Sequence, residues 1–317
     1  MKVVITDVYD MQFEEEKKLF ESVGATLEIS HCVTEQDVIK AGRGAVALIN
    51  SEIPITHNII SSLPDLKVIA KYSIGVDNID VDAATEHGVY VANVPDYCQE
   101  DVANHTLALI MALTQKIISL NQIVKQGKWS FKDGAPLHRI HTQTVGLISF
   151  GRIAQQLAQK LLSIGFKVIA HDPYCSRTDM DVDLVSLEEL MRQSDVISVH
   201  TPLVKETYHM IDKNVLAMAK PTAILVNAGR GAVINEEDLI HALREGIIAG
   251  AGLDVLEEEP INDHNPLLKM DNVILTPHIG FYSEESMQEL QHKTALNVVD
   301  VLQGNKPRYH VNHVEKA

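Results

Sequence analysis

The sequence predicts an α/β fold with two domains, each built around a parallel β-sheet. Short apolar runs of strand type alternate with helical patterns from one end of the chain to the other. Such alternation is typical of parallel strands joined by crossover helices. At 317 residues the chain is also too long for one ordinary hydrophobic core, so two domains are the simplest expectation.

The first series of elements fills the N-terminal third of the chain. We expect a helix over Phe13–Val23, and short apolar strands at Lys2–Thr6, Ala45–Ile49, Leu66–Ala70 and Val89–Ala92. After them, Glu100–Leu120 is apolar on most faces and opens with two acidic residues, which suits a helix N-terminus. More than one neighbour must cover such a helix, so we expect it to be buried between domains or subunits.

A second alternating series begins at Thr142. A helix is expected between its first two strands, ending near Leu162, and a last helix over Ser283–Leu302. Terminal helices often return to the first domain, which would make that domain discontinuous. The expected strands are Val145–Ile148, Lys167–Ala170, Val196–Val199, Ala223–Val226, Ile248–Leu253 and Val273–Leu275.

Composition excludes several classes of protein. Hydrophobic residues make up 45% of the chain and charged residues 22%, as in ordinary globular proteins. The net charge of −16 argues against direct nucleic-acid binding, which needs a basic face. No apolar stretch reaches the ~18 residues of a membrane span. Cys32, Cys98 and Cys175 are scattered and odd in number, so we expect neither a metal site nor a disulfide framework. A reducing cytoplasm is the simplest compartment.

Three polar residues follow strand-like runs in the C-terminal half. They are Arg230, Glu259 and His278. The carboxyl ends of parallel strands are where open α/β sheets bind ligands. Together the three residues supply a fixed cation for a carboxylate, a carboxylate, and an acid–base group that the carboxylate can tune.

The turn after the strand Val145–Ile148 fits a dinucleotide fingerprint. The pattern is Gly-x-Gly-x-x-Gly/Ala, and its three defined positions are occupied here by Ser149, Gly151 and Ala154. Serine at the first position is a departure that would strain the tight turn. Asp172 ends the next strand, 21 residues after Gly151. An acid there can bind the ribose hydroxyls and repel a 2′-phosphate, so the sequence predicts NAD rather than NADP.

Several ordered motifs together resemble the D-isomer-specific 2-hydroxyacid dehydrogenase family over nearly the whole chain. Residues Pro277–Glu284 and Phe166–Tyr174 are most similar to the C-terminal-binding-protein subgroup, which includes transcriptional corepressors that bind NAD. The motifs are Lys71–Asp80, the loop at Gly151, His200–Leu203, Asn227–Gly231, Glu259–Pro260 and Pro277–His278.

The resemblance implies two Rossmann-like domains, one flavodoxin-like and one dinucleotide-binding, with the substrate in the cleft between them. The substrate domain would be residues 1–97 and 285–317, and the NAD-binding domain residues 98–284. The family is usually dimeric through the helix after residue 100. We therefore expect a homodimer through the 100–120 region.

The resemblance also implies a role for each matching residue. Arg230 would bind the substrate carboxylate and carbonyl. His278 would be the acid–base group, and Glu259 would orient the His278 ring. On chemistry alone, Glu257 and Glu258 are alternatives to Glu259. Ser73, Ile74 and Gly75 would bind the substrate carboxylate through backbone N–H groups. NAD would contact Ser149, Gly151, Arg152, Ile153, Asp172, Thr201, Pro202, Ala228, Asp254 and Gly280. No metal is expected.

The predicted function is NAD-dependent interconversion of a small unphosphorylated 2-oxo acid and its D-2-hydroxy acid by hydride transfer. Glu52 follows the strand Ala45–Ile49, where relatives that take phosphorylated substrates have arginines, and it would repel a phosphate. One alternative is an NAD(H)-sensing, corepressor-like binding protein with weak or no physiological dehydrogenase activity. Another is oxidation of a non-carboxylate substrate such as formate or phosphite.

Overall fold

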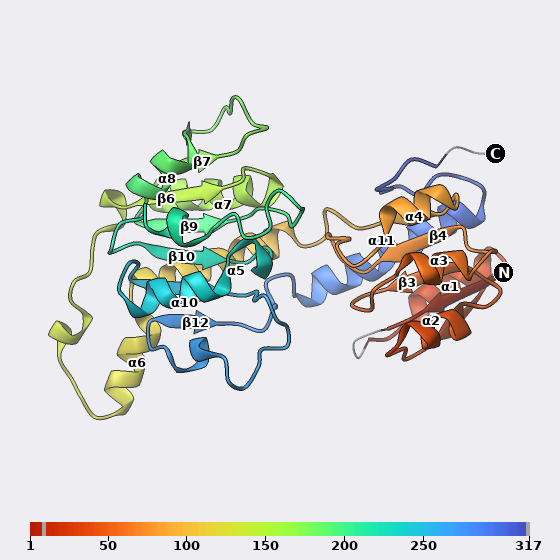
Figure 1. The fold of residues 1–317 in the computed structure, drawn as a ribbon, viewed down its shortest axis with the longest axis horizontal. Coiled ribbons are helices and arrows are strands. Elements are labelled where there is room, and N and C mark those ends of the chain that lie inside the picture. The colour runs from red at the N-terminus through yellow and green to blue at the C-terminus, as the bar shows by residue number, and fades with distance from the viewer. Residues whose placement is uncertain (8–10, 315–317) are drawn as a thin grey trace. The chain divides into compact units, whose positions relative to one another are not determined.

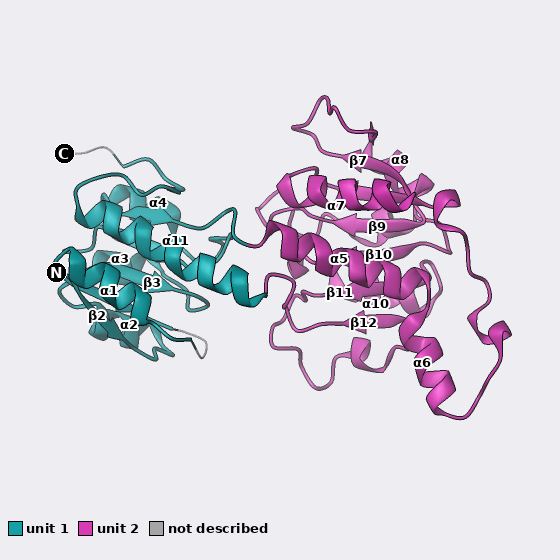
Figure 2. Cartoon of the chain, turned by 180° about the vertical axis from the view of Figure 1, so that it is seen from behind, with its two compact units in different colours: residues 1–97, 283–317 teal, residues 98–282 magenta. Residues whose placement is uncertain are grey.

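The computed structural model describes residues 1–7 and 11–314, which form two compact units (Figure 2). Unit 1 consists of residues 1–97 and 283–317, and unit 2 of residues 98–282. The second boundary thus falls between 282 and 283, where the sequence suggested 284 and 285. Both units are α/β, with parallel strands throughout, so the predicted fold class is confirmed.

Unit 1 is a parallel five-stranded sheet of order β2-β1-β3-β4-β5, the flavodoxin-like order. Its strands are β1 (Lys2–Ile5), β2 (Thr26–Ile29), β3 (Ala45–Asn50), β4 (Val68–Lys71) and β5 (Tyr90–Ala92). Its helices are α1 (Glu14–Ser22), α2 (Glu35–Gly42), α3 (His57–Ser61), α4 (Val81–Glu86) and α11 (Glu284–Leu302). β2 was not predicted, because this mostly exposed edge strand mixes polar and apolar residues.

The C-terminal helix α11 belongs to unit 1, which is therefore discontinuous in sequence (Figure 2). It begins with a capping box in which Ser283 and Ser286 bond each other's backbone N–H. Leu290, Ala295 and Val298 are buried on its inner face, and the helix packs against α1, β3 and β4.

Unit 2 is a parallel seven-stranded sheet of order β12-β11-β10-β9-β6-β7-β8. The strands are β6 (Thr144–Ile148), β7 (Lys167–His171), β8 (Asp183–Leu184), β9 (Val196–Val199), β10 (Ile224–Asn227), β11 (Gly250–Leu253) and β12 (Val273–Leu275). The chain order reverses between β6 and β9, as in dinucleotide-binding sheets. The loops that leave these two strands therefore flank the topological switch point, where such sheets bind ligands.

Helices cover both faces of this sheet (Figure 1). The α-helices are α5 (Gln99–Thr114), α6 (Ile117–Lys125), α7 (Arg152–Ile164), α8 (Leu187–Gln193), α9 (Lys213–Leu216) and α10 (Glu236–Arg244). Short 3₁₀ turns occupy η1 (Phe131–Gly134), η2 (Ile140–Thr142), η3 (Gly231–Val233) and η4 (Pro266–Lys269). α5 packs against α7, β10 and β11. It lies so close to β11 that a Cβ on Gly252 would sit 2.9 Å from Leu113 Cδ1.

The prediction of one continuous helix over Glu100–Leu120 is wrong. α5 ends at Thr114, and α6 begins after Lys116, whose φ of 51° is left-handed and interrupts the helical hydrogen bonding. The two helices meet at 55°. The break falls where α5 stops packing on the sheet, since α6 has no buried residue and projects from unit 2 (Figure 1).

Within residues 1–7 and 11–314, no single helix is long and apolar enough to span a membrane. The bent pair α5 and α6 meets that test of length and composition when the two are taken together. Much of α5, however, is buried against its own sheet and α7.

Candidate active site

The candidate site lies at one edge of unit 2, where three neighbouring strands end. β10, β11 and β12 are adjacent and parallel, so their carboxyl ends meet at the same edge. Arg230 follows β10, Asp254 follows β11, and His278 follows β12. Residues far apart in sequence are thereby gathered by the order of the strands.

His278 and Glu259 form a hydrogen-bonded pair. Nδ1 of His278 lies 2.7 Å from Oε2 of Glu259, and Oε1 of Glu259 accepts the N–H of Leu256 at 2.8 Å. The bond to Glu259 raises the pKa of His278, and this outweighs burial, which lowers it. Burial alone would raise the pKa of Glu259, but its bonds to His278 and Leu256 lower it.

The neighbouring glutamates do not share this contact. Glu257 contacts the ring of His209 and accepts the N–H of Glu236. The ambiguity among the three consecutive glutamates is therefore resolved in favour of Glu259 as the partner of His278.

Arg230 is held beside this pair by a close approach of two loops. A Cβ on Gly231 would lie only 1.9 Å from the carbonyl oxygen of Leu256, so only glycine lets the loop after β10 press against the loop that carries Glu259. Asn227 Nδ2 donates to the Arg230 carbonyl at 2.9 Å. The Arg230 charge is close enough to lower the pKa of His278, although less than Glu259 raises it.

Asp254 is buried beneath the turn that carries His278. Its side chain is 2% exposed. Oδ1 accepts the N–H of Ile279 at 3.0 Å and the hydroxyl of Thr276 at 2.6 Å, and Oδ2 accepts the N–H of Gly280 at 2.8 Å. Burial would raise the pKa of Asp254, but these bonds and one from His105 lower it to about 2. The carboxylate predicted to bind cofactor is thus also a fixed anchor for the turn.

The fingerprint loop leads from β6 into α7. Ser149 has a φ of 69°, the left-handed conformation that favours glycine at this first position, which costs roughly 1–2 kcal/mol in other residues. Its hydroxyl lies 3.0 Å from that of Thr201, which follows β9. Two loops flanking the switch point are thereby joined.

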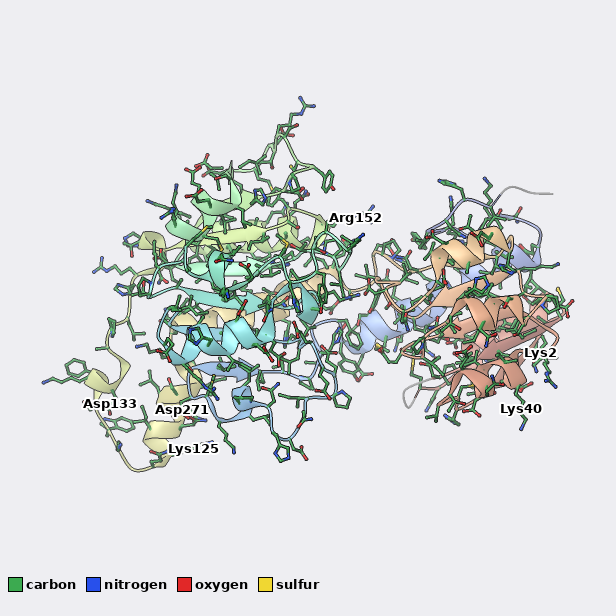
Figure 3. The ribbon with its side chains drawn as sticks, viewed as in Figure 1. Lys2, Lys40, Lys125, Asp133, Arg152 and Asp271 are labelled. Atoms are coloured by element: carbon green, nitrogen blue, oxygen red, sulfur yellow. The ribbon has the colours of Figure 1, made fainter. Side chains whose placement is uncertain are left out.

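This loop fits a dinucleotide. Gly151 is the N-cap residue of α7. A Cβ on Gly151 would have no atom within 4 Å, so the backbone at the start of α7 faces open space. A pyrophosphate can approach the helix N-terminus there. Ala154 is fully buried, as close helix packing requires. Arg152 is exposed at the start of α7 (Figure 3), and Ile153 is half-buried.

Asp172 follows β7 and lies against the same loop. Its Oδ2 accepts the N–H of Phe150 at 2.8 Å, and its Oδ1 accepts the N–H of Tyr174 at 2.8 Å. The remaining predicted cofactor residues are Pro202 after β9, which is exposed, Ala228 after β10, which is half-buried, and Gly280, which is buried.

The predicted carboxylate loop, Ser73–Gly75, belongs to unit 1 and follows β4. Its three carbonyls accept bonds from Val94 N–H, the Asn93 amide and the Ser73 hydroxyl. These three hydrogen bonds fix the conformation of the loop. Its backbone N–H groups are then the donors that suit an anion. Its role in substrate binding stays a prediction.

Sequence reasoning missed two polar residues, His105 and Thr276. Nε2 of His105, on α5, lies 2.9 Å from the Thr276 hydroxyl. The presence of a histidine within the mostly apolar stretch Glu100–Leu120 was a signal that could have identified His105.

Among the described residues, no group of three or more His, Cys, Asp or Glu side chains is placed to hold a metal.

Comparison with known proteins identifies the family. Residues 107–280, more than half of the chain, match the family model "D-isomer specific 2-hydroxyacid dehydrogenase, NAD binding domain". A glyoxylate reductase of Korarchaeum cryptofilum is 38% identical over 266 residues, 82% of this chain and 80% of that protein. A D-3-phosphoglycerate dehydrogenase of Methanocaldococcus jannaschii is 37% identical over 317 residues, 98% of this chain and 59% of that protein.

A solved structure agrees with this result. The D-lactate dehydrogenase of Aquifex aeolicus, in complex with NAD and lactic acid, superposes with a TM-score of 0.85 at 30% identity and covers 96% of both chains. The chain therefore belongs to the D-isomer-specific 2-hydroxyacid dehydrogenase family and is an NAD-dependent enzyme that interconverts 2-oxo acids and D-2-hydroxy acids.

Proposed function

We propose that the substrate is a small unphosphorylated 2-oxo acid, with His278 as acid–base group, Glu259 as its orienting partner and Arg230 as the carboxylate-binding cation. The 2.7 Å pair of His278 and Glu259 at the edge that also carries Arg230 supports this most strongly. NADH would be held by the Ser149–Gly151 loop and Asp172, and it supplies the hydride when bound.

In the proposed mechanism each residue has one task in reduction. Because Nδ1 of His278 is engaged by Glu259, Nε2 is the nitrogen left to donate a proton to the substrate carbonyl oxygen. As the hydride reaches C2, this proton converts the developing alkoxide to the hydroxyl. The planar guanidinium of Arg230 is suited to hold the carboxylate in two hydrogen bonds. In oxidation, neutral His278 accepts the proton.

A substrate panel tests the proposal. The protein is incubated with NADH and glyoxylate, pyruvate, hydroxypyruvate, branched-chain 2-oxo acids and phosphohydroxypyruvate. We expect turnover of one or more small unphosphorylated acids and poor turnover of phosphohydroxypyruvate, because Glu52 is exposed where a phosphate-binding cation would be needed. Efficient use of phosphohydroxypyruvate, as the name of the Methanocaldococcus relative allows, would overturn the restriction to unphosphorylated substrates.

Glu259→Gln is expected to move the pH profile of reduction to lower pH. Reduction needs protonated His278, so its rate is full below the pKa of His278 and falls as pH rises through it. Glu259 raises that pKa, so its removal should make the rate fall at a lower pH. Glu257→Gln is the matched control, because Glu257 contacts His209 instead. Superimposable profiles for Glu259→Gln and the parent would contradict the pairing.

Asp172→Asn is expected to narrow the preference of the protein for NADH over NADPH. In the parent we expect NADH to bind at least about tenfold tighter, since the Asp172 charge opposes a 2′-phosphate. Asparagine keeps an acceptor for the Phe150 N–H but removes the charge, so the loop stays in place. Fluorescence titration with both cofactors measures the change. Equal affinities in the parent would refute the role of Asp172.

The subgroup placement rests on the sequence alone. Segments 166–174 and 277–284 support a C-terminal-binding-protein-like member. The named relatives are enzymes, and they give no support to the alternative of a corepressor-like binding protein.

The proposed homodimer through the 100–120 region is supported by exposed apolar side chains that begin at the start of α6, within that region, and continue to residue 137. Its exposed apolar side chains include Ile117, Trp129 at 89% and Phe131 at 90% exposure, and the segment between the labels Lys125 and Asp133 stands out from unit 2 (Figure 3). Trp129 is the single tryptophan of the chain, so its emission should shift to the red as a dimer dissociates on dilution. If sedimentation showed a monomer at all concentrations, the dimer would be excluded.

The cytoplasmic location of the protein stays a prediction.

A further inference from the structure

His105 reaches from α5 to the turn that carries His278. Its Nε2 lies 2.9 Å from the Thr276 hydroxyl and 3.3 Å from Oδ1 of Asp254. α5 itself is fixed by its packing against α7, β10 and β11. His105 is therefore attached to a rigid support on one side and to a loop on the other.

The donor and acceptor in each of these hydrogen bonds follow from the number of protons that each group can donate. A hydroxyl has one proton to donate, and the Thr276 hydroxyl donates it to Oδ1 of Asp254 at 2.6 Å. The hydroxyl can then only accept from His105. Nε2 of His105 must carry a proton, as it does in the imidazolium and in one neutral tautomer.

The chain of bonds continues to both sides of His278. Asp254 accepts the N–H groups of Ile279 and Gly280, the next two residues, while Thr276 precedes Pro277 and His278. The His278 N–H donates to the backbone carbonyls of Asp254 and Thr276 at 2.8 and 3.0 Å. The N–H groups of His278 and of the two residues after it thus all bond to Thr276 or Asp254.

The turn needs such support because it is strained and tightly packed. His278 has a φ of 50°, a conformation that non-glycine residues keep only where surrounding contacts enforce it. At Gly280, a Cβ would lie 2.9 Å from Oδ2 of Asp254 and 3.4 Å from Cδ2 of His105. The ring of His105 therefore forms one wall of the space in which the turn sits.

We propose that His105 is a positioning residue that, through Thr276 and Asp254, holds the strained turn so that His278 meets its substrate in the reactive geometry. The inference rests on the proposed acid–base role of His278. Misplacing a reacting group by about 1 Å can cost 10²-fold in rate. We therefore expect His105→Leu to lower kcat by about 10–100-fold. KM and NADH affinity should change little, because NADH is expected to rest mainly on the Gly151 loop and Asp172 rather than on this turn.

Recovery of kcat in a conservative variant distinguishes a positioning role of His105 from a general effect on folding. His105→Gln retains a donor near the place of Nε2 and should recover most of the lost kcat. Thr276→Val, which removes the hydroxyl, should lower kcat as His105→Leu does, and Thr276→Ser should restore it. Because the residues act in one chain, the double variant His105→Leu with Thr276→Val should lose no more than the worse single variant. Asn104→Leu, at the exposed neighbouring position on α5, is the matched control.

The experiment measures kcat, KM, the NADH dissociation constant and the kinetic isotope effect with deuterated NADH for each full-length variant and for His278→Ala. A slower chemical step should give His105→Leu a larger isotope effect with unchanged NADH binding. Near-parental kcat in His105→Leu, equal loss in His105→Gln, or loss of NADH binding together with kcat would overturn the inference. Retained turnover in His278→Ala would instead refute the proposed function on which it rests.

Discussion

His278→Ala is expected to lower turnover by about 10²–10⁴-fold while leaving NADH binding nearly unchanged. The size of the loss is that of a positioned general acid, because the alkoxide formed by hydride addition would have to take its proton from water. Cofactor affinity should largely persist because NADH is expected to rest mainly on the Gly151 loop and Asp172, which follow other strands of the sheet, and only in part on Asp254 and Gly280 beside His278. Single-turnover measurements with excess enzyme, beside fluorescence titration of NADH, provide both quantities.

The chain contains a matched control for this experiment. His292 pairs with Glu15 in unit 1 with the same 2.7 Å distance between Nδ1 and a carboxylate oxygen, and its side chain is 45% exposed against 44% for His278. His292→Ala should therefore remove an equivalent hydrogen-bonded His–Glu pair without effect on turnover. If His278→Ala kept near-parental turnover, the proton donor would be a different residue.

The parallel sheets and the residues at the ends of their strands could be predicted from sequence because both depend on local patterns. A buried parallel strand is a short apolar run, and the residue after it is placed by the sheet wherever the remaining chain goes. Arg230 and His278 were identified in this way. The fingerprint at Gly151 was identified from its spacing, which needs no tertiary information.

Features that depend on packing could not be predicted. The edge strand β2 carries no apolar run, and the break at Lys116 occurs where α5 leaves the sheet, which the continuous apolar character of Glu100–Leu120 conceals. Glu259 was assigned as the partner of His278 only through the family resemblance, because the chemistry of three consecutive glutamates left Glu257 and Glu258 open. His105 is 171 residues from Thr276 in sequence, and only the packing of α5 brings them together.

Arg230→Ala is expected to lower kcat/KM by about 10²–10³-fold, which is the size of the loss when a charge-stabilising donor is removed from an active site. Unlike His278, Arg230 would contact the substrate carboxylate both before and during reaction. KM should therefore rise while kcat falls, whereas His278→Ala should act mainly on kcat. Initial rates over a range of 2-oxo acid concentrations separate these two effects.

The geometry of the guanidinium makes lysine a discriminating second variant. Arg230→Lys keeps the positive charge but loses the planar fork, so it should recover only part of the loss if the carboxylate is bound through two hydrogen bonds. Arg308, which pairs with Asp300 at 2.9 Å in unit 1, provides the control for loss of an arginine elsewhere. Arg230 also lowers the pKa of His278, so its removal should let the reduction rate persist to higher pH, opposite in direction to Glu259→Gln. Unchanged KM in Arg230→Ala would show that Arg230 does not bind the carboxylate. A pH profile displaced to lower pH would show that Arg230 does not lower the pKa of His278.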